Sequence, residues 1–293
     1  MAAAKSRRRV VLHEDDVGMS HGANSAFLEL VRFGVCSSGS VMVPCPWFLE
    51  IAETAAADPS IDLGVHLTLN AEKRYYKWRP LTAPSPKAGL TDEHGFFFPD
   101  VATTRRKASP EAVETELRAQ IDAAYDAGID VTHLDAHMGA ALSPEFCDIY
   151  IRLGLEYRLP ILLTSTIAAF TPNDNLVGVT EEAHGRGVNK ARAAGFAIFD
   201  AALQTTWNRS RSKPAEPAYK AIIESVRDGL TFICFHFNAP GEVELIEPRS
   251  AYIRTEEYQL FRSEGFRAWL GAQDLDIIGM RPLRDELRAR LPG

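Results

Sequence analysis

Short apolar runs alternate with amphipathic segments along this 293-residue chain. A short apolar run bounded by turn residues is typical of a buried strand, whereas apolar residues three or four positions apart indicate a helix. By these criteria we expect strands at 10–12, 37–43, 61–69, 131–137, 160–163, 230–237 and 277–278. We expect helices from about residue 23, at 46–57, 110–127, 144–153, 191–204, 217–227 and 252–269, and at the C-terminus. Strands that alternate with helices predict an α/β fold with a mainly parallel sheet.

The alternation stops between residues 70 and 107, a segment rich in Pro, Gly, basic and aromatic residues. A loop of this length inside a compact domain is usually a lid or a binding element. The alternative is a small satellite cluster packed on the surface. We therefore predict one domain over residues 1–293 with a loop insertion at about 70–107.

Charge and composition exclude several classes of protein. The formal net charge of −7 argues against nucleic acid as the main partner. No apolar run reaches the length of a membrane span, and the N-terminus lacks the apolar core of a secretion signal. The four cysteines are widely spaced and form no Cys-x-x-Cys pair, which argues against a structural zinc site. We expect a cytoplasmic protein with reduced cysteines. The sequence does not distinguish a monomer from a homodimer.

Polar residues suited to metal binding or proton transfer stand at the ends of four predicted strands. They are Asp15 with Asp16, His66, Asp135 with His137, and His236. The carboxyl ends of parallel strands lie on one face, which is where α/β folds bind their ligands. A barrel, complete or distorted, brings four such ends together best.

Asp16, His66 and His137 are the candidate ligands of one divalent metal ion. One carboxylate and two imidazoles leave coordination positions open, as a catalytic metal requires. Two nitrogen ligands favour zinc, with magnesium or another divalent ion as the alternative. Such an ion lowers the pKa of its bound water and polarises a carbonyl. Asp15 is then placed to act as general base and His236 to protonate the leaving group, which together describe hydrolysis of an amide or ester.

Two further strand residues compete for these roles. His133 shares a strand face with Asp135 and His137, because side chains two positions apart point the same way, and it is the rival metal ligand. Asp135 is the candidate for orienting a metal-binding histidine through a hydrogen bond, without binding the metal itself. The remaining histidines, His13, His21, His94 and His184, are expected to be ordinary core or rim residues.

Three segments together resemble the signatures of the YdjC/ChbG carbohydrate deacetylase family: 15–20 (DDVGMS), 64–69 (GVHLTL) and 132–137 (THLDAH). The resemblance implies a distorted (β/α) barrel, a divalent metal, and removal of acetyl groups from N-acetylated sugars. By position, Asp15 matches the base of this family, and Asp16, His66 and His137 match its metal ligands. This chain departs from the family pattern at Gly139, where a further histidine is usual, and in the spacing from His236 to Pro240.

The predicted partner is accordingly an acetylated sugar, which the insertion is placed to contact. Aromatic rings can cover the apolar face of a sugar, and a guanidinium can bind its oxygens. The candidate contacts are Tyr75, Tyr76, Trp78 and Arg79. The alternative function is a non-catalytic carbohydrate-binding or regulatory protein on the same barrel. Asp15 favours the enzyme, since a binding site has no need of a base. A metal phosphoesterase is less favoured, because no carboxylate cluster for two metals stands out.

Overall fold

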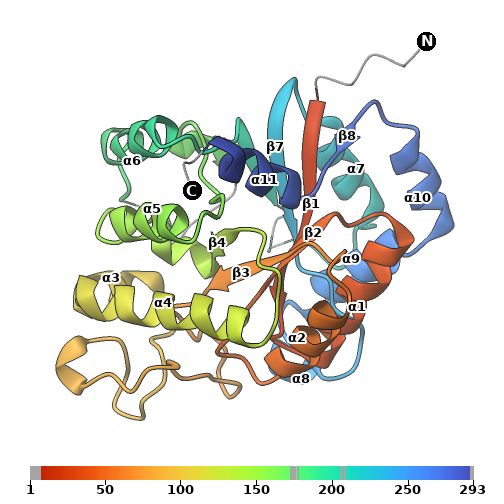
Figure 1. Cartoon of the computed structure of the whole chain (residues 1–293). Coiled ribbons are helices and arrows are strands. Elements are labelled where there is room, and N and C mark those ends of the chain that lie inside the picture. Colours follow the sequence, from red (N-terminus) through yellow and green to blue (C-terminus); the bar gives the residue numbers. More distant parts are fainter. Residues whose placement is uncertain (1–7, 172–175, 177, 205–206, 208, 291–293) are drawn as a thin grey trace.

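Parallel strands form one curled sheet at the centre of the molecule (Figure 1). The computed structural model describes residues 8–171, 176, 178–204, 207 and 209–290, so the ends of the predicted domain, 1–7 and 291–293, lie outside the described residues. Within these ranges the sheet has eight strands in the order β4-β3-β2-β1-β7-β6-β5, and β8 pairs with β1. The strands are β1 Arg8–Val17, β2 Ser38–Val41, β3 Leu63–Leu67, β4 Leu134–Ala136, β5 Phe170–Thr171, β6 Ala201–Gln204, β7 Gly229–Phe235 and β8 Asp276–Ile277. The pairs between these strands are all parallel, as the sequence predicted.

Helices surround this sheet (Figure 1). They are α1 His21–Phe33, α2 Phe48–Ala57, α3 Val101–Lys107, α4 Pro110–Asp126, α5 Cys147–Glu156, α6 Glu181–Ala193, α7 Glu216–Glu224, α8 Val243–Ile246, α9 Ala251–Phe261, α10 Glu264–Gly271 and α11 Arg281–Arg290. Short 3₁₀ turns among the described residues are η1 Pro86–Ala88, η2 His137–Leu142 and η3 Ile167–Ala169. The alternation of helices and strands confirms the predicted α/β fold.

The sheet curls into a distorted barrel that is joined only weakly at one place. The predicted strand 160–163 lies in this gap, but it forms isolated bridges rather than a ladder. On one side Leu134 of β4 pairs with Ile161, and on the other Thr164 pairs with Phe199, just before β6. The backbone of Leu134 donates to the carbonyl of Pro160 at 2.9 Å. The predicted distorted barrel is thus confirmed, with its irregular part between β4 and β6.

Two predicted helices are wrong in part. The helix predicted at 191–204 instead comprises the end of α6 and the strand β6, separated by Gly195 with φ of 89°. Residues of β6 pair with both β5 and β7, and this pairing overrides the local helical pattern. The helix predicted at 252–269 is two helices, because Ser263 caps a new helix by accepting from the backbone of Phe266.

The turn from β1 into α1 follows directly after the candidate residues Asp15 and Asp16 at the end of β1. Ser20 caps α1 by accepting a hydrogen bond from the backbone of Ala23 at 3.0 Å. Asn24 accepts from the backbone of Gly18 at 2.7 Å and stabilises the turn. Strand β1 therefore ends in a turn whose polar groups are satisfied within the protein.

We expected reduced cysteines and no membrane-spanning segment. Cys36, Cys45 and Cys147 are buried, Cys234 is half-buried, and all four are free thiols. Among the described residues, no helix combines the length and the apolar character needed to cross a bilayer.

Candidate metal and catalytic site

The end of β1 is irregular, and this irregularity brings two neighbouring carboxylates to one site. In a regular strand, successive side chains point to opposite faces. The pairing of β1 with β2 shifts register between Glu14 and Val17. Asp16 also has φ of 62°, a costly conformation for a residue other than glycine and one that is concentrated at functional sites. Asp15 and Asp16 consequently both contact buried histidines.

The three predicted metal ligands lie together at the carboxyl ends of their strands. The Oδ1 atom of Asp16 is 3.0 Å from Nδ1 of His137 and 3.5 Å from Nε2 of His66. One ligand atom of each residue lies within 4.8 Å of the others, and all three side chains are buried. The chain turns sharply after His137, where Gly139 adopts φ of 70°, a conformation that favours glycine.

A carboxylate holds the outer nitrogen of each histidine in this group. Nδ1 of His66 lies 2.8 Å from Oδ1 of Asp135. Nε2 of His137 lies 2.9 Å from Oε2 of Glu72, a residue of the insertion that the sequence did not single out. Carboxylates in this position fix the tautomer and the ring orientation of metal-binding histidines. The group therefore combines candidate metal ligands with the carboxylate contacts that support such ligands.

The charges of the group create a place for a cation. Burial acts to raise the pKa of Asp16, but Arg254 and His137 outweigh it and hold that pKa well below its usual range. Burial acts to lower the pKa of His137, but Glu72 and Asp16 raise it to about 9. The carboxylates thus favour a positive charge between them, which the protonated His137 supplies. A divalent ion that displaces the histidine protons could take over this charge.

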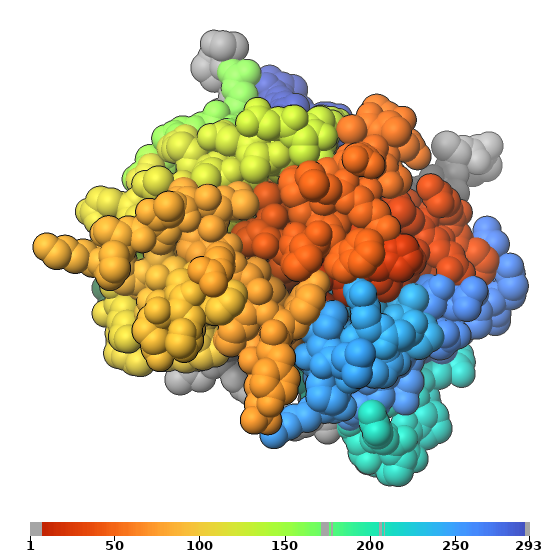
Figure 2. Space-filling view, turned by 90° about the horizontal axis from the view of Figure 1, so that it is seen from below, coloured from red at the N-terminus to blue at the C-terminus, as the bar shows by residue number. Residues whose placement is uncertain are grey.

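Sequence reasoning missed a network of buried charges around Asp16. Arg254 of α9 donates from Nη2 to Oδ2 of Asp16 at 2.8 Å and from Nε to Oε2 of Glu247 at 2.7 Å. Lys73 lies 2.8 Å from the same oxygen of Glu247 and 2.9 Å from Glu72. Figure 2 shows the corresponding face, where orange residues of the insertion lie beside light-blue residues that follow β7. The network joins the insertion to α9 across the candidate site.

The sequence carried one signal for this network. Arg254 and Glu257 lie on the buried face of α9 together with the apolar residues Ile253, Tyr258 and Phe261. Charged residues are rarely buried unless they are paired, so their position in the helical pattern marks a polar contact. The pattern does not identify the partner.

Asp15 and His236 face each other, with 3.6 Å between Oδ2 and Nε2. Burial raises the pKa of Asp15 to about 7, so this carboxylate can take up and release a proton near neutral pH. Burial, together with Arg254, lowers the pKa of His236 to about 3, so its ring is neutral. The backbone of His236 donates to Glu257 at 2.7 Å, and the ring packs edge-on against Trp207 with 4.5 Å between ring centroids.

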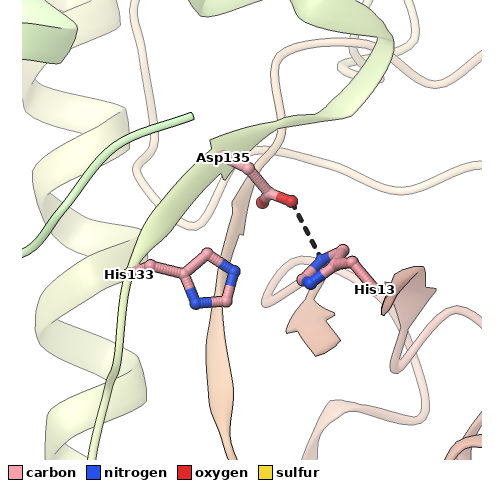
Figure 3. A group of neighbouring side chains, drawn as sticks. All are labelled: His13, His133 and Asp135. Atoms are coloured by element: carbon pink, nitrogen blue, oxygen red, sulfur yellow. Dashed lines mark ion pairs between the residues drawn. The ribbon is translucent and has the colours of Figure 1, made fainter. Parts of the chain in front are cut away.

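His133, the rival ligand, lies in a second cluster with His13 and Asp135 (Figure 3). Nε2 of His13 is 3.1 Å from Oδ2 of Asp135, and the ring centroids of His13 and His133 are 5.0 Å apart. His133 therefore groups with different residues from His66 and His137. His13, expected to be an ordinary core or rim histidine, is fully buried, and its two ring nitrogens contact Ser38 and Ser40. Its place beside His133 and Asp135 was not predicted, because it stands inside β1, before the polar end of the strand.

The insertion residues proposed to contact a substrate occupy different environments. Tyr75 is 82% exposed and Tyr76 is half-buried. Trp78 is only 3% exposed, and its ring lies edge-on to His137 with 6.0 Å between centroids. Arg79 places its guanidinium over an aromatic ring within the insertion. The insertion is thus partly a packed cluster, in which Trp78 packs against the candidate ligand His137, and partly an exposed edge.

The other three histidines, expected to be ordinary core or rim residues, belong to none of the candidate metal-binding groups found among the described residues. His94 is exposed, and His21 is exposed and pairs with Glu50 at 2.7 Å. His184 is buried, and its Nε2 donates to the carbonyl of Thr164 at 2.7 Å.

Comparison with known proteins identifies the family. Residues 9–272 match the family described as YdjC-like protein. The chain belongs to this family. The resemblance drawn from the segments 15–20, 64–69 and 132–137 is therefore confirmed.

Several relatives of this YdjC-like chain are similar over part or most of its length. A carbohydrate deacetylase from Thermus thermophilus is 42% identical over 161 residues, which cover 55% of each chain. Another, from Thermoanaerobacter pseudethanolicus, is 28% identical, and the chain spans 60% of its length. The chain thus spans little more than half the length of these two relatives. Carbohydrate deacetylase 1 from Listeria innocua is 27% identical over 282 residues, 94% of this chain and all of that relative.

A solved structure has the same fold. It comes from Enterococcus faecalis and is described as a proposed cellobiose-phosphate cleavage protein. The match has a TM-score of 0.74 at 18% identity and covers 96% of this chain and 99% of the other.

Proposed function

We propose that this protein is a metal-dependent hydrolase that removes an acetyl group from an N-acetylated amino sugar or a related glycoconjugate. The family and the names of the relatives support the reaction class. The observation that carries the proposal is the convergence of Asp16, His66 and His137 on one buried point, with Asp15 next to it in the chain.

The donor set supports one divalent ion, held by Asp16, His66 and His137. Two imidazole nitrogens make zinc the first candidate, with magnesium or another divalent ion as the alternative. An ion at this position supplies Lewis acidity, which polarises the amide carbonyl of the substrate and acidifies water. Arg254 keeps Oδ2 of Asp16 engaged, so that Oδ1 is the oxygen directed at the two histidines.

Asp15 and His236 provide the proposed proton path. Asp15 accepts a proton from the attacking water as general base, a role that suits a carboxyl whose pKa is about 7. His236 is neutral before the reaction, so it must receive a proton before it can act as an acid. Asp15 is the source, because its Oδ2 lies 3.6 Å from Nε2 of His236. His236 then protonates the departing amine.

The exposed edge of the insertion is the proposed sugar contact. Tyr75 and Tyr76 retain ring surface for the apolar face of a pyranose. Trp78 supports the site indirectly, because it packs on His137. Arg79 stabilises the insertion, because its guanidinium lies over the ring of Phe96.

Acetate release from a panel of N-acetylated sugars and short oligosaccharides tests the proposal. We expect release by the zinc-loaded protein and loss of release in Asp15→Asn and His137→Ala. Binding of these sugars without any acetate release would instead support the non-catalytic carbohydrate-binding alternative. A folded, zinc-loaded protein that neither binds nor deacetylates any member of the panel would contradict both.

A further inference from the structure

We propose that the cluster of His13, His133 and Asp135 is a second cation site, separate from the site of the proposed hydrolase. One ligand atom of each residue lies within 4.8 Å of the others. The three side chains are 0%, 0% and 1% exposed. In Figure 3 they approach one another inside the barrel, His13 from β1 and the other two from β4 and the residues before it. This inference requires no assumption about the reaction that the protein catalyses.

His133 presents an unpaired nitrogen to this cluster. Its Nδ1 lies 2.9 Å from Oγ1 of Thr132. Its Nε2 is buried, and within the described part of the chain it has no hydrogen-bond partner. In the proposed site the ring carries its proton on Nδ1 and donates it to the Thr132 hydroxyl, so that Nε2 has a free lone pair. A buried acceptor without a partner is unfavourable, and a cation would satisfy it.

The unpaired nitrogen is directed at the rest of the cluster. In Figure 3, one ring nitrogen of His133 points to the side on which His13 and Asp135 lie. The ring is held in this orientation by close packing against Gly64. A Cβ atom at that position would lie 2.5 Å from two ring atoms of His133, so only glycine leaves room for the imidazole. Among the described residues, Nε2 of His133 is therefore unpaired and is held in an orientation that suits binding of a cation.

His13 and Asp135 supply the other two donors. Nδ1 of His13 is engaged by Oγ of Ser38 at 2.7 Å, and its Nε2 lies 3.0 Å from Oγ of Ser40 and 3.1 Å from Oδ2 of Asp135. Asp135 uses Oδ1 for His66, and its Oδ2 accepts from Oγ of Ser40 at 2.8 Å and lies 3.1 Å from Nε2 of His13. A cation at this point would take the place of these two contacts of Oδ2. Two imidazole nitrogens and one carboxylate oxygen form a donor set that favours zinc or a similar late transition metal. Asp135 would then connect the two sites, with one oxygen serving each.

Metal content measured by mass spectrometry tests this site. The full chain is prepared from zinc-supplemented cultures and dialysed against metal-free buffer. We expect two zinc ions per chain in the unaltered protein, one in His133→Leu, one in His137→Ala, and none in the double variant. His184→Asn is the matched control, because this buried histidine lies in neither cluster and should leave both ions in place.

A titration of the metal-free protein with Co²⁺, followed by visible absorption, keeps the proposal testable if His133→Leu does not fold. Absorbance that saturates at two equivalents supports the second site. Saturation at one equivalent, with no Co²⁺ absorbance left in His137→Ala, overturns it. A single ion lost in His133→Leu but retained in His137→Ala would support this cluster and overturn the ligand assignment of the proposed hydrolase, so the two failures are distinguishable.

Discussion

Nη2 of Arg254 lies 2.8 Å from Oδ2 of Asp16, although the two residues are 238 positions apart in the sequence. Each is only 2% exposed. A buried ion pair of this kind contributes little net stability, because desolvation of both charges offsets their attraction, but it fixes geometry. Here the guanidinium engages one oxygen of the proposed metal ligand and leaves the other directed at His66 and His137.

We expect Arg254→Met to weaken metal binding, because Asp16 loses the partner that orients it. Loss of a contact that supports a metal ligand typically costs about 10–100-fold in affinity. Competition with a chelating dye measures the change, and Arg254→Lys should restore part of it. Arg262→Met is the control, because Arg262 pairs with Glu29 on the surface. Equal affinities of the Arg254 and Arg262 variants would show that the guanidinium does not position Asp16.

His66→Ala and His137→Ala should each lose the metal of the proposed hydrolytic site. Each variant removes one of three proposed ligands and leaves too few donors for tight binding. Metal analysis after dialysis measures the loss, with the exposed His94→Ala as the control. Full occupancy of this site in both variants would rule out the assignment.

Asp15→Asn should lower the rate far more than the metal content. The amide keeps the shape of the side chain but cannot accept the proton. We expect kcat to fall about 10²–10⁴-fold, the typical contribution of a general base. Acetate release and zinc content are measured on the same preparation. Normal turnover by the Asn variant would assign the base to another residue.

His236→Gln should lower kcat while zinc stays bound. Its ring is the proposed carrier between Asp15 and the departing amine, so substrates with better leaving groups should be less affected. Comparing acetamides with amine and aniline leaving groups measures this difference. An equal loss for both classes would indicate a positioning role, through the contacts of His236 with Trp207 and Glu257.

Trp78→Ala and Tyr75→Ala should separate packing from substrate contact. Trp78 is buried, and truncation of a buried aromatic residue costs about 3–5 kcal/mol of unfolding free energy, so we expect a lower Tm. Tyr75 is exposed, and its loss should raise KM without a change in Tm. Thermal unfolding and steady-state kinetics on both variants provide the test. A lower Tm for Tyr75→Ala with unchanged KM would remove this residue from the substrate contacts.

The sequence by itself determined those features that depend on neighbouring residues. The apolar runs predicted most of the strands, and the parallel sheet followed from the alternation of elements. Because parallel strands end on one face, the polar residues at those ends predicted that Asp16, His66 and His137 would meet.

Only the tertiary structure decided the contacts between distant segments. The partners Arg254, Glu72 and Glu247 lie in ordinary helix and loop positions, and nothing local identifies which charge each one meets. The same holds for residues 201–204, where pairing with β5 and β7 overrides a helical pattern. The apolar pattern of β1 predicted that His13 would be buried. Its contacts with Asp135 and His133 were not predicted, because the neighbours of a buried side chain depend on how the whole barrel packs.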